Sequence, residues 1–149
     1  MTSTRRGATI LFDEVSVGDP LPDLRIEITP TLIVSAAIAS RDYEAVHLDR
    51  DLAQQRGSKD IFMNILTSNG LVGRYVTDWT GPDALLKSVD IRLGAPNYPG
   101  DTMVLAGRVT ARHATADGGI VDLEVVGRNG LGDHVTATVR VHLPAEANR

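Results

Sequence analysis

Residues 41–51, RDYEAVHLDRD, contain side chains that are suited to acid/base chemistry. Asp42 and His47 lie at the two ends of the stretch DYEAVH, and a tight turn there would bring both into one pocket. A carboxylate and an imidazole so placed can hold one water, take a proton from it as general base and return a proton as general acid. The residue types alone leave an alternative open, because polar side chains in surface loops are mostly solvated or structural.

Two short helices are expected on either side of this stretch. Residues 29–42, TPTLIVSAAIASRD, offer Thr29 as N-cap and a proline at the first helical position, although no conventional C-cap follows. Residues 49–57 offer Asp49 as the N-cap of a short helix and Gly57 as its end. These two helices would hold the Asp42–His47 turn between them.

A longer helix is predicted over residues 64–79, NILTSNGLVGRYVTDW, where apolar residues recur at helical spacing. Gly70 and Gly73 lie inside it, each costing roughly 1 kcal/mol of helix propensity relative to Ala. A helix can carry such glycines where another backbone comes close. The sequence GPD at 81–83 ends it.

The second half of the chain changes to a period of two, which indicates β-strands. A short strand is also expected at 24–29, after a loop at 12–24. Turn-forming sequences at 116–119 and 129–133 favour antiparallel pairing of neighbouring strands. The prediction is an α+β fold in which one long, apolar helix lies on the concave side of an antiparallel sheet. The residues expected to share one face within each of the later strands are Leu85, Lys87, Val89, Ile91 and Leu93, then Met103, Leu105, Val109 and Ala111, then Val121, Leu123 and Val125, and last Val135, Ala137, Val139, Val141 and Leu143.

Length and composition limit the classes of protein to consider. The 149 residues suit a single domain over 11–144, with a flexible N-terminal leader at 1–10 and a tail at 145–149. A net charge of −4 argues against nucleic acid as a partner, and the absence of cysteine excludes disulfides and thiolate zinc sites. No apolar run approaches the roughly 18 residues of a membrane span, and no signal peptide is evident, so a cytoplasmic protein is expected.

The chain resembles the MaoC-like enoyl-CoA hydratases, which have the hot-dog fold, an antiparallel sheet wrapped around a central helix. The resemblance extends from about Phe12 to Leu143. The family motif runs Asp, aromatic, Asn, Pro, aliphatic, His, then a short helix ending in Gly. The matching residues are Asp42, Tyr43, Val46, His47 and Gly57, with Ala95, Pro96, Pro99, Gly100 and Asp101 matching the family's later Pro-Gly-Asp turn.

Two departures from the family pattern lie near the motif. Glu44-Ala45 replaces the usual Asn-Pro, in which the Asn is expected to brace the catalytic turn. Phe62-Met63-Asn64 replaces the Ala-His-Gly that precedes the central helix. In the family, the backbone N–H of that Gly helps to polarise the thioester carbonyl. A backbone donor survives a change of side chain, so the resemblance implies that the N–H of Asn64 takes this role.

The implied reaction is hydration of a 2-enoyl-CoA to a 3-hydroxyacyl-CoA. Asp42 and His47 would orient and deprotonate water, and Asn64 N–H would stabilise the thioester oxygen, without a metal or other cofactor. Tyr43 and Arg92 are candidate substrate-binding residues, the arginine because a guanidinium matches the CoA phosphates. Their alternatives are a core or interface aromatic and a solvated arginine.

Within the family, the sequence is most similar to the small subunit of actinobacterial hydratases that act on steroid side-chain enoyl-CoA esters in cholesterol β-oxidation. That similarity implies a second hot-dog chain as partner, in a heterodimer or heterotetramer, or otherwise a homodimer, since an exposed sheet edge is normally covered. Ser58, Ser68 and Gly70 would leave room for a bulky ring system or serve plain packing. The alternatives are a non-catalytic hot-dog partner subunit and, less favoured, an acyl-CoA thioesterase.

The remaining histidines do not suggest a metal site. His113, His134 and His142 are scattered along the chain, and no carboxylates accompany them at metal-ligand spacing. The alternation of the last strand places His134 and His142 together with threonines on the face opposite the apolar one.

Overall fold

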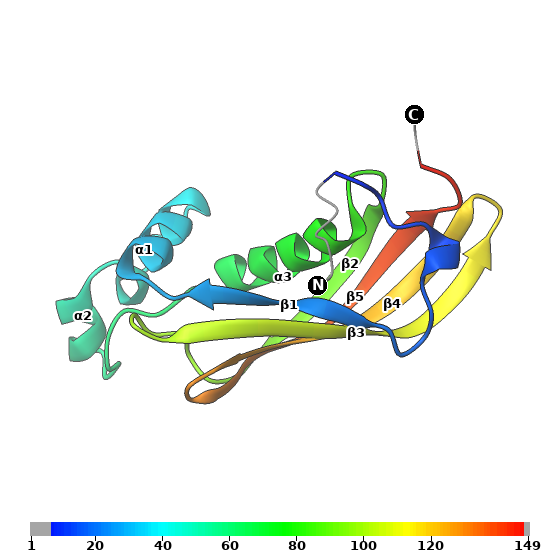
Figure 1. Ribbon diagram of the computed structural model, residues 1–149. Coiled ribbons are helices and arrows are strands. Elements are labelled where there is room, and N and C mark those ends of the chain that lie inside the picture. The colour runs from blue at the N-terminus through cyan, green and yellow to red at the C-terminus, as the bar shows by residue number, and fades with distance from the viewer. Residues whose placement is uncertain (1–6, 148–149) are drawn as a thin grey trace.

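The computed structural model describes residues 7–147, and Figure 1 shows a curved sheet with one long helix lying across its concave face. All strand pairs are antiparallel, and the strand order is β1-β3-β4-β5-β2. This is the predicted α+β, hot-dog architecture. The strands are β1 (Pro20–Glu27), β2 (Leu85–Leu93), β3 (Thr102–Thr115), β4 (Gly118–Asn129) and β5 (Gly132–Pro144), and the helices are α1 (Pro30–Ala39), α2 (Arg50–Gln55) and α3 (Ile65–Thr80), with short 3-10 turns η1 (Phe12–Glu14) and η2 (Ala45–His47).

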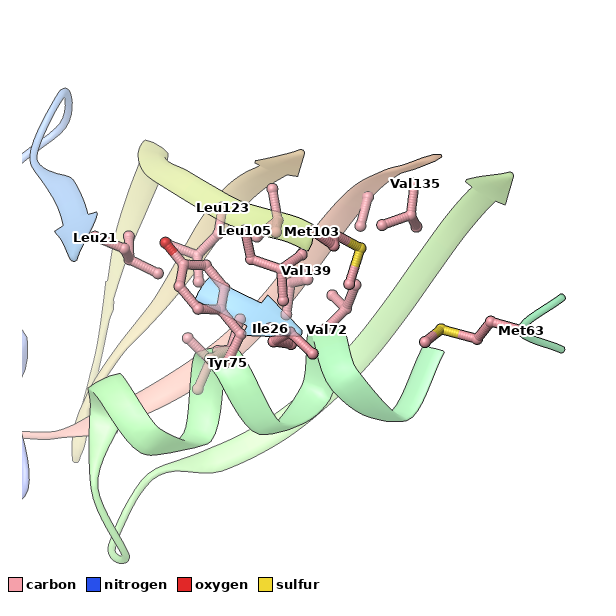
Figure 2. Packing of buried hydrophobic residues seen from close by; sticks show 14 of the residues in the cluster. Leu21, Ile26, Met63, Val72, Tyr75, Met103, Leu105, Leu123, Val135 and Val139 are labelled. Carbon is pink, nitrogen blue, oxygen red and sulfur yellow. The ribbon is translucent and has the colours of Figure 1, made fainter. Parts of the chain in front are cut away.

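The core lies between α3 and the sheet. Val72, Tyr75 and Val76 are spaced three and four residues apart, are almost completely buried, and extend from one face of the helix toward the strands. They meet inward-facing strand residues such as Leu105 and Leu123, as Figure 2 shows. Burial of each such apolar side chain contributes roughly 1.5–3 kcal/mol, so this face fixes the helix on the sheet.

The glycines of α3 are not explained by a neighbouring backbone in the described chain. A side chain at Gly70 would meet no atom within 4 Å, and one at Gly73 would only touch the side chain of Leu86 at 3.8 Å. The close backbone approach expected at these positions does not occur within residues 7–147. Gly70 instead lies on the exposed flank of the helix.

Strand β1 begins earlier than the sequence predicted. Residues 20–24 were expected to belong to a loop, yet Pro20 and Leu21 already pair with β3. The register then shifts between Leu21 and Leu24, so Pro22 and Asp23 occupy an irregularity in the ladder. A bulge on an edge strand tolerates a proline, and for this reason the Pro-rich sequence did not look like a strand.

Helices α1 and α2 lie together at the end of the molecule where α3 begins (Figure 1). Both start at the predicted caps. Thr29 Oγ1 accepts from the N–H of Leu32 at 3.0 Å, and Asp49 Oδ1 accepts from the N–H of Leu52 at 3.1 Å. The stretch with Asp42 and His47 connects the two helices, so it is placed beside the first turn of α3.

The end of α1 carries a cap that the sequence did not indicate. Arg41 has a φ of 57°, the left-handed conformation usually taken by Gly after a helix. Its N–H donates to Ile38 O at 3.0 Å, and the N–H of Asp42 donates to Ala37 O at 2.9 Å. This pair of bonds is a Schellman motif, and it fixes the direction in which Asp42 leaves the helix.

The ends of the described chain are docked on the domain. Of the leader expected over residues 1–10, residues 1–6 lie outside the described part. Thr9 Oγ1 donates to Asp83 Oδ2 at 2.9 Å and Ile10 N–H donates to Thr80 O at 2.8 Å. At the other end, Ala145 N–H donates to Asp117 O at 2.9 Å. None of the helices between residues 7 and 147 has the length and apolar character needed to cross a membrane.

Candidate active site

The structure brings Asp42 and His47 together, as their spacing predicted. Asp42 follows the cap of α1, and His47 ends the 3-10 turn η2 five residues later. The distance from Asp42 Oδ2 to His47 Nε2 is 3.5 Å, and the two side chains are 22% and 11% exposed. The pair is therefore sheltered but open on one side.

The backbone assigns the tautomer of His47. Its Nδ1 lies 2.7 Å from Phe62 O, and a carbonyl oxygen can only accept, so Nδ1 carries the proton. In the neutral ring, Nε2 then presents a lone pair toward the carboxylate of Asp42. Two acceptors 3.5 Å apart do not bond to each other, but a water can donate one hydrogen to each. A water on the open side of the pair can thus have both of its O–H bonds polarised by acceptors.

Asp42 is held as a carboxylate by its own donors. Asn64 Nδ2 donates to Oδ2 at 2.9 Å, and the N–H of Glu44 donates to Oδ1 at 3.3 Å. The Asn64 bond, with help from Glu44 N–H and the nearby His47, lowers the pKa of Asp42, although partial burial opposes them. The side chain of Glu44 takes no part, because it points to Arg56 at 3.1 Å on the surface.

Asn64 lies at the N-cap of α3, where free backbone donors gather. Its side chain accepts from the N–H of Thr67 at 3.0 Å. Within residues 7–147, the N–H of Asn64 itself donates to no protein acceptor. A free N–H at a helix N-terminus can stabilise a developing negative charge. The position is therefore compatible with the predicted oxyanion role, which stays a prediction.

The two predicted substrate-binding residues, Tyr43 and Arg92, lie in different places relative to the Asp42–His47 pair. Tyr43 is next to Asp42 in the chain but is 67% exposed. Arg92 lies on β2 opposite Thr136, on the outer face of the sheet, where it lines a shallow cavity with Glu124. Helix α3 covers the other face. The substrate-binding roles of both residues remain predictions.

His134 contradicts the alternation expected for the last strand. It is 2% exposed and faces α3, whereas the sequence placed it with the exposed threonines. The cause is a bulge: Arg128 pairs with Asp133 and Gly127 with Val135, so His134 has no partner of its own and its side chain is redirected.

Hydrogen bonds occupy both nitrogens of His134. Nδ1 lies 2.7 Å from Ala95 O, and Nε2 lies 2.7 Å from Ser68 Oγ on α3. Burial lowers the pKa of His134, while the carbonyl of Ala95 opposes this shift. Ser68 is fully buried and donates to this histidine, so it does not provide open space for a substrate. No sequence signal identified this pair.

Metal-ligating side chains do not cluster in the described part of the chain. Between residues 7 and 147, no group of three or more His, Cys, Asp or Glu is placed to hold a metal ion.

Comparison with known proteins places the chain in a family. No protein-family model matches it. It is 56% identical over 127 residues to the beta subunit of 3-oxo-4,17-pregnadiene-20-carboxyl-CoA hydratase from Mycobacterium tuberculosis, a match that covers 85% of this chain and 95% of that subunit. It also matches a chain of the ChsH1–ChsH2 complex from Mycobacterium tuberculosis, with a TM-score of 0.82 and 55% identity over 86% of this chain and 98% of that one.

A more distant solved structure shares the fold. The R-hydratase PhaJ1 from Pseudomonas aeruginosa is 21% identical, with a TM-score of 0.83 over 93% of this chain and 88% of its own length. Identity at that level speaks only for the architecture, whereas the 56% match extends over nearly the whole of a hydratase subunit. On these findings, the chain belongs to the MaoC-like hot-dog hydratases.

Proposed function

We propose that this chain is the motif-bearing subunit of a heteromeric hydratase that adds water to a 2-enoyl-CoA thioester and forms a 3-hydroxyacyl-CoA. The observation that carries the proposal is the sheltered pair of acceptors, Asp42 Oδ2 and His47 Nε2, which lie 3.5 Å apart and can both accept from one water beside them. The free N–H of Asn64, whose side chain is bonded to Asp42, supports it.

The proposed steps use these three groups. Asp42 and His47 accept hydrogen bonds from one water, and a proton leaves that water as its oxygen forms a bond to C3 of the substrate. The electron pair of the C2–C3 double bond moves toward the thioester oxygen, which Asn64 N–H stabilises as an enolate. The proton held by the pair then returns to C2. No metal enters these steps, because the hydrogen-bonded carbonyl serves as the electron sink.

The proposed substrate carries a steroid acyl group. The support comes from the 56% identical relative, whose name describes a pregnadiene-carboxyl-CoA, a thioester on a steroid side chain. The corresponding pathway would be the β-oxidation of steroid or cholesterol side chains, in the cytoplasm where CoA thioesters are used.

The proposed partner is a second hot-dog chain. The relative is a beta subunit, and a similar chain was solved within a two-protein complex. In this chain, β2 is an edge strand, and exposed apolar side chains lie both on it and on the start of α3. They are Ile65, Leu66, Leu85, Leu86 and Leu93, each 37–55% exposed. A partner strand on β2 and a partner helix beside the open Gly70 would cover them.

The decisive experiment is a hydration assay on the chain alone and with a co-purified partner. Short-chain and steroid-type enoyl-CoA esters are compared, and loss of the enoyl absorbance is followed. The proposal expects hydration of the steroid-type ester, abolished by Asp42→Asn in this chain. Full activity of Asp42→Asn would assign the active site to the other chain, and release of free thiol without hydration would indicate a thioesterase.

A further inference from the structure

The carboxamide of Asn64 uses all of its hydrogen-bonding capacity. Its two N–H bonds go to Ser40 Oγ at 3.0 Å and Asp42 Oδ2 at 2.9 Å. Its oxygen accepts from the N–H and from the hydroxyl of Thr67. The residue is 1% exposed, so water does not compete for these bonds.

These partners fix the orientation of the amide. The N–H of Thr67 needs an acceptor and the carboxylate of Asp42 needs a donor, so the oxygen must face α3 and the nitrogen must face Asp42. Few other side chains meet both demands. Asp caps a helix equally well but turns a second carboxylate toward Asp42, and Ser caps a helix but is too short to reach it.

We propose that the side chain of Asn64 is a positioning residue for the hydration, because it ties the carboxylate of Asp42 to the helix terminus that carries the oxyanion donor. The general base and the N–H donor act at opposite ends of the reacting enoyl thioester. A single rigid amide between them sets their separation, a role distinct from that of the Asn64 backbone. This inference rests on the function proposed above.

The surroundings of Asp42 leave this task to Asn64. Glu44, at the bracing position of the motif, directs its side chain to Arg56 on the surface and offers Asp42 only a longer backbone bond of 3.3 Å. Ser40, which accepts the second amide hydrogen, donates to Ala36 O at 2.8 Å and so anchors the amide to the end of α1. The Asn64 bond is also the largest of the influences that lower the pKa of Asp42.

Two variants separate positioning from capping. Asn64→Ser keeps the cap of α3 and removes the bond to Asp42, so kcat for hydration is expected to fall about 10- to 100-fold, the loss typical of a hydrogen bond to a charged group, with KM little changed. Asn64→Asp keeps the cap and replaces the donor by a carboxylate. Protonation of that carboxylate restores a donor, so the ratio of variant to parent kcat is expected to rise as pH is lowered from 8 to 6.

Asp49→Ser provides the matched control. It makes the same exchange to Ser at the cap of α2, which keeps a capping oxygen and does not touch Asp42. Its kcat should stay within about twofold of the parent, because Ser and Asp cap helices almost equally well. All three variants are compared in the full chain with its co-purified partner, and thermal unfolding shows that each is folded.

Two results would overturn the inference: an unchanged kcat in Asn64→Ser, or a variant-to-parent ratio for Asn64→Asp that does not depend on pH. The second test stands even where Asn64→Ser folds poorly. A ¹³C NMR titration of the Asp42 carboxyl, assigned with Asp42→Asn, gives a readout independent of activity. Asn64→Ser should raise its pKa, and an unshifted titration counts against the inference. If the parent hydrates no ester, the proposed function fails and this titration still decides the role of Asn64.

Discussion

His47 and His134 are held in the same way and are left with different tasks. Each places Nδ1 2.7 Å from a backbone carbonyl, Phe62 O in one case and Ala95 O in the other. In the neutral ring, each therefore presents the lone pair of Nε2. His47 contacts Phe62, just before α3, and His134 contacts Ser68, in the first turn of α3. The difference is what meets that lone pair. Ser68 Oγ donates to His134 at 2.7 Å, whereas His47 faces a carboxylate oxygen at 3.5 Å.

The comparison shows that the group facing Nε2 decides whether an imidazole is available as a general base. The buried hydroxyl of Ser68 occupies the Nε2 lone pair of His134, so no free acceptor remains for a water, and the ring serves as a structural link between β5, α3 and the loop at Ala95. The acceptor facing His47 leaves its nitrogen unsatisfied unless a water enters. Tautomer control by a backbone carbonyl is common to both sites and does not by itself identify a catalytic histidine.

The largest effect on activity should follow from replacing His47, the histidine whose Nε2 has no protein donor among residues 7–147. His47→Gln is expected to lower kcat for enoyl-CoA hydration about 100- to 10,000-fold, the usual contribution of a general acid/base, because a carboxamide is too weakly basic to take a proton from the water. Thermal unfolding should change little, since the side chain links few elements. Steady-state kinetics measures kcat, and calorimetry measures thermal unfolding. A variant that keeps parent activity would remove the distinction between the two histidines.

His134, whose two ring nitrogens are both hydrogen-bonded, should affect stability rather than activity. His134→Ala leaves a cavity, removes the donor to Ala95 O and leaves Ser68 Oγ only its 3.4 Å bond to Asn64 O, so it is expected to lower the free energy of unfolding by about 2–4 kcal/mol. Urea unfolding measures this. Ser68→Ala should cost less, about 1–3 kcal/mol, because only His134 Nε2 loses its partner. A stable His134→Ala protein with abolished activity would show that this site too takes part in the chemistry.

Protonation offers a gentler way to disturb His134. Burial lowers its pKa in the folded state, so the unfolded chain binds more protons below its ordinary pKa of about 6.5. The stabilising contribution is complete above about pH 6.5 and is lost as pH falls toward the folded pKa, by at most about 1.4 kcal/mol per pH unit. Urea unfolding at pH 7.5 and 5.0 should show this loss in the parent and a smaller one in His134→Ala. Equal losses would contradict a buried, neutral His134.

The smallest effect concerns the residue that aims Asp42 toward His47. Arg41 has a φ of 57°, a conformation that costs a non-glycine residue about 1–2 kcal/mol. Replacement by Gly removes this cost, but Gly loses more backbone entropy on folding, which offsets part of the gain. Arg41→Gly is therefore expected to raise the free energy of unfolding by about 0.5–1 kcal/mol with kcat unchanged. A destabilised variant would mean that the Arg41 side chain stabilises the turn more than its conformation strains it.

Local patterns predicted what depends on local structure. The caps at Thr29 and Asp49 and the meeting of Asp42 with His47 follow from neighbours in the chain, and the structure contains all of them. The outer-face position of Arg92 was also implicit, because the alternation that places Val89 and Ile91 on one face of the strand places Arg92 on the other. A substrate role was assigned to it on chemistry alone.

Bulges and long-range contacts explain what the sequence did not show. Pro22 and Asp23 suggested a loop because they occupy a register shift within β1. The bulge at Gly127 and Arg128 redirected the side chain of His134. The bond between Asn64 and Asp42 joins residues 22 positions apart, and it exists only because α1 ends beside the start of α3. No periodicity encodes such a meeting, since it depends on how whole elements pack.

The open edge of β2 has a consequence for how the protein is produced. Its unpaired backbone groups and the leucines beside them can recruit another strand of any origin, so a newly made copy is a template for aggregation until that edge is covered. Synthesis of the partner chain in matching amounts would therefore limit aggregation. Surplus copies would be removed by chaperones and proteases, and the amount of folded protein would follow the scarcer chain.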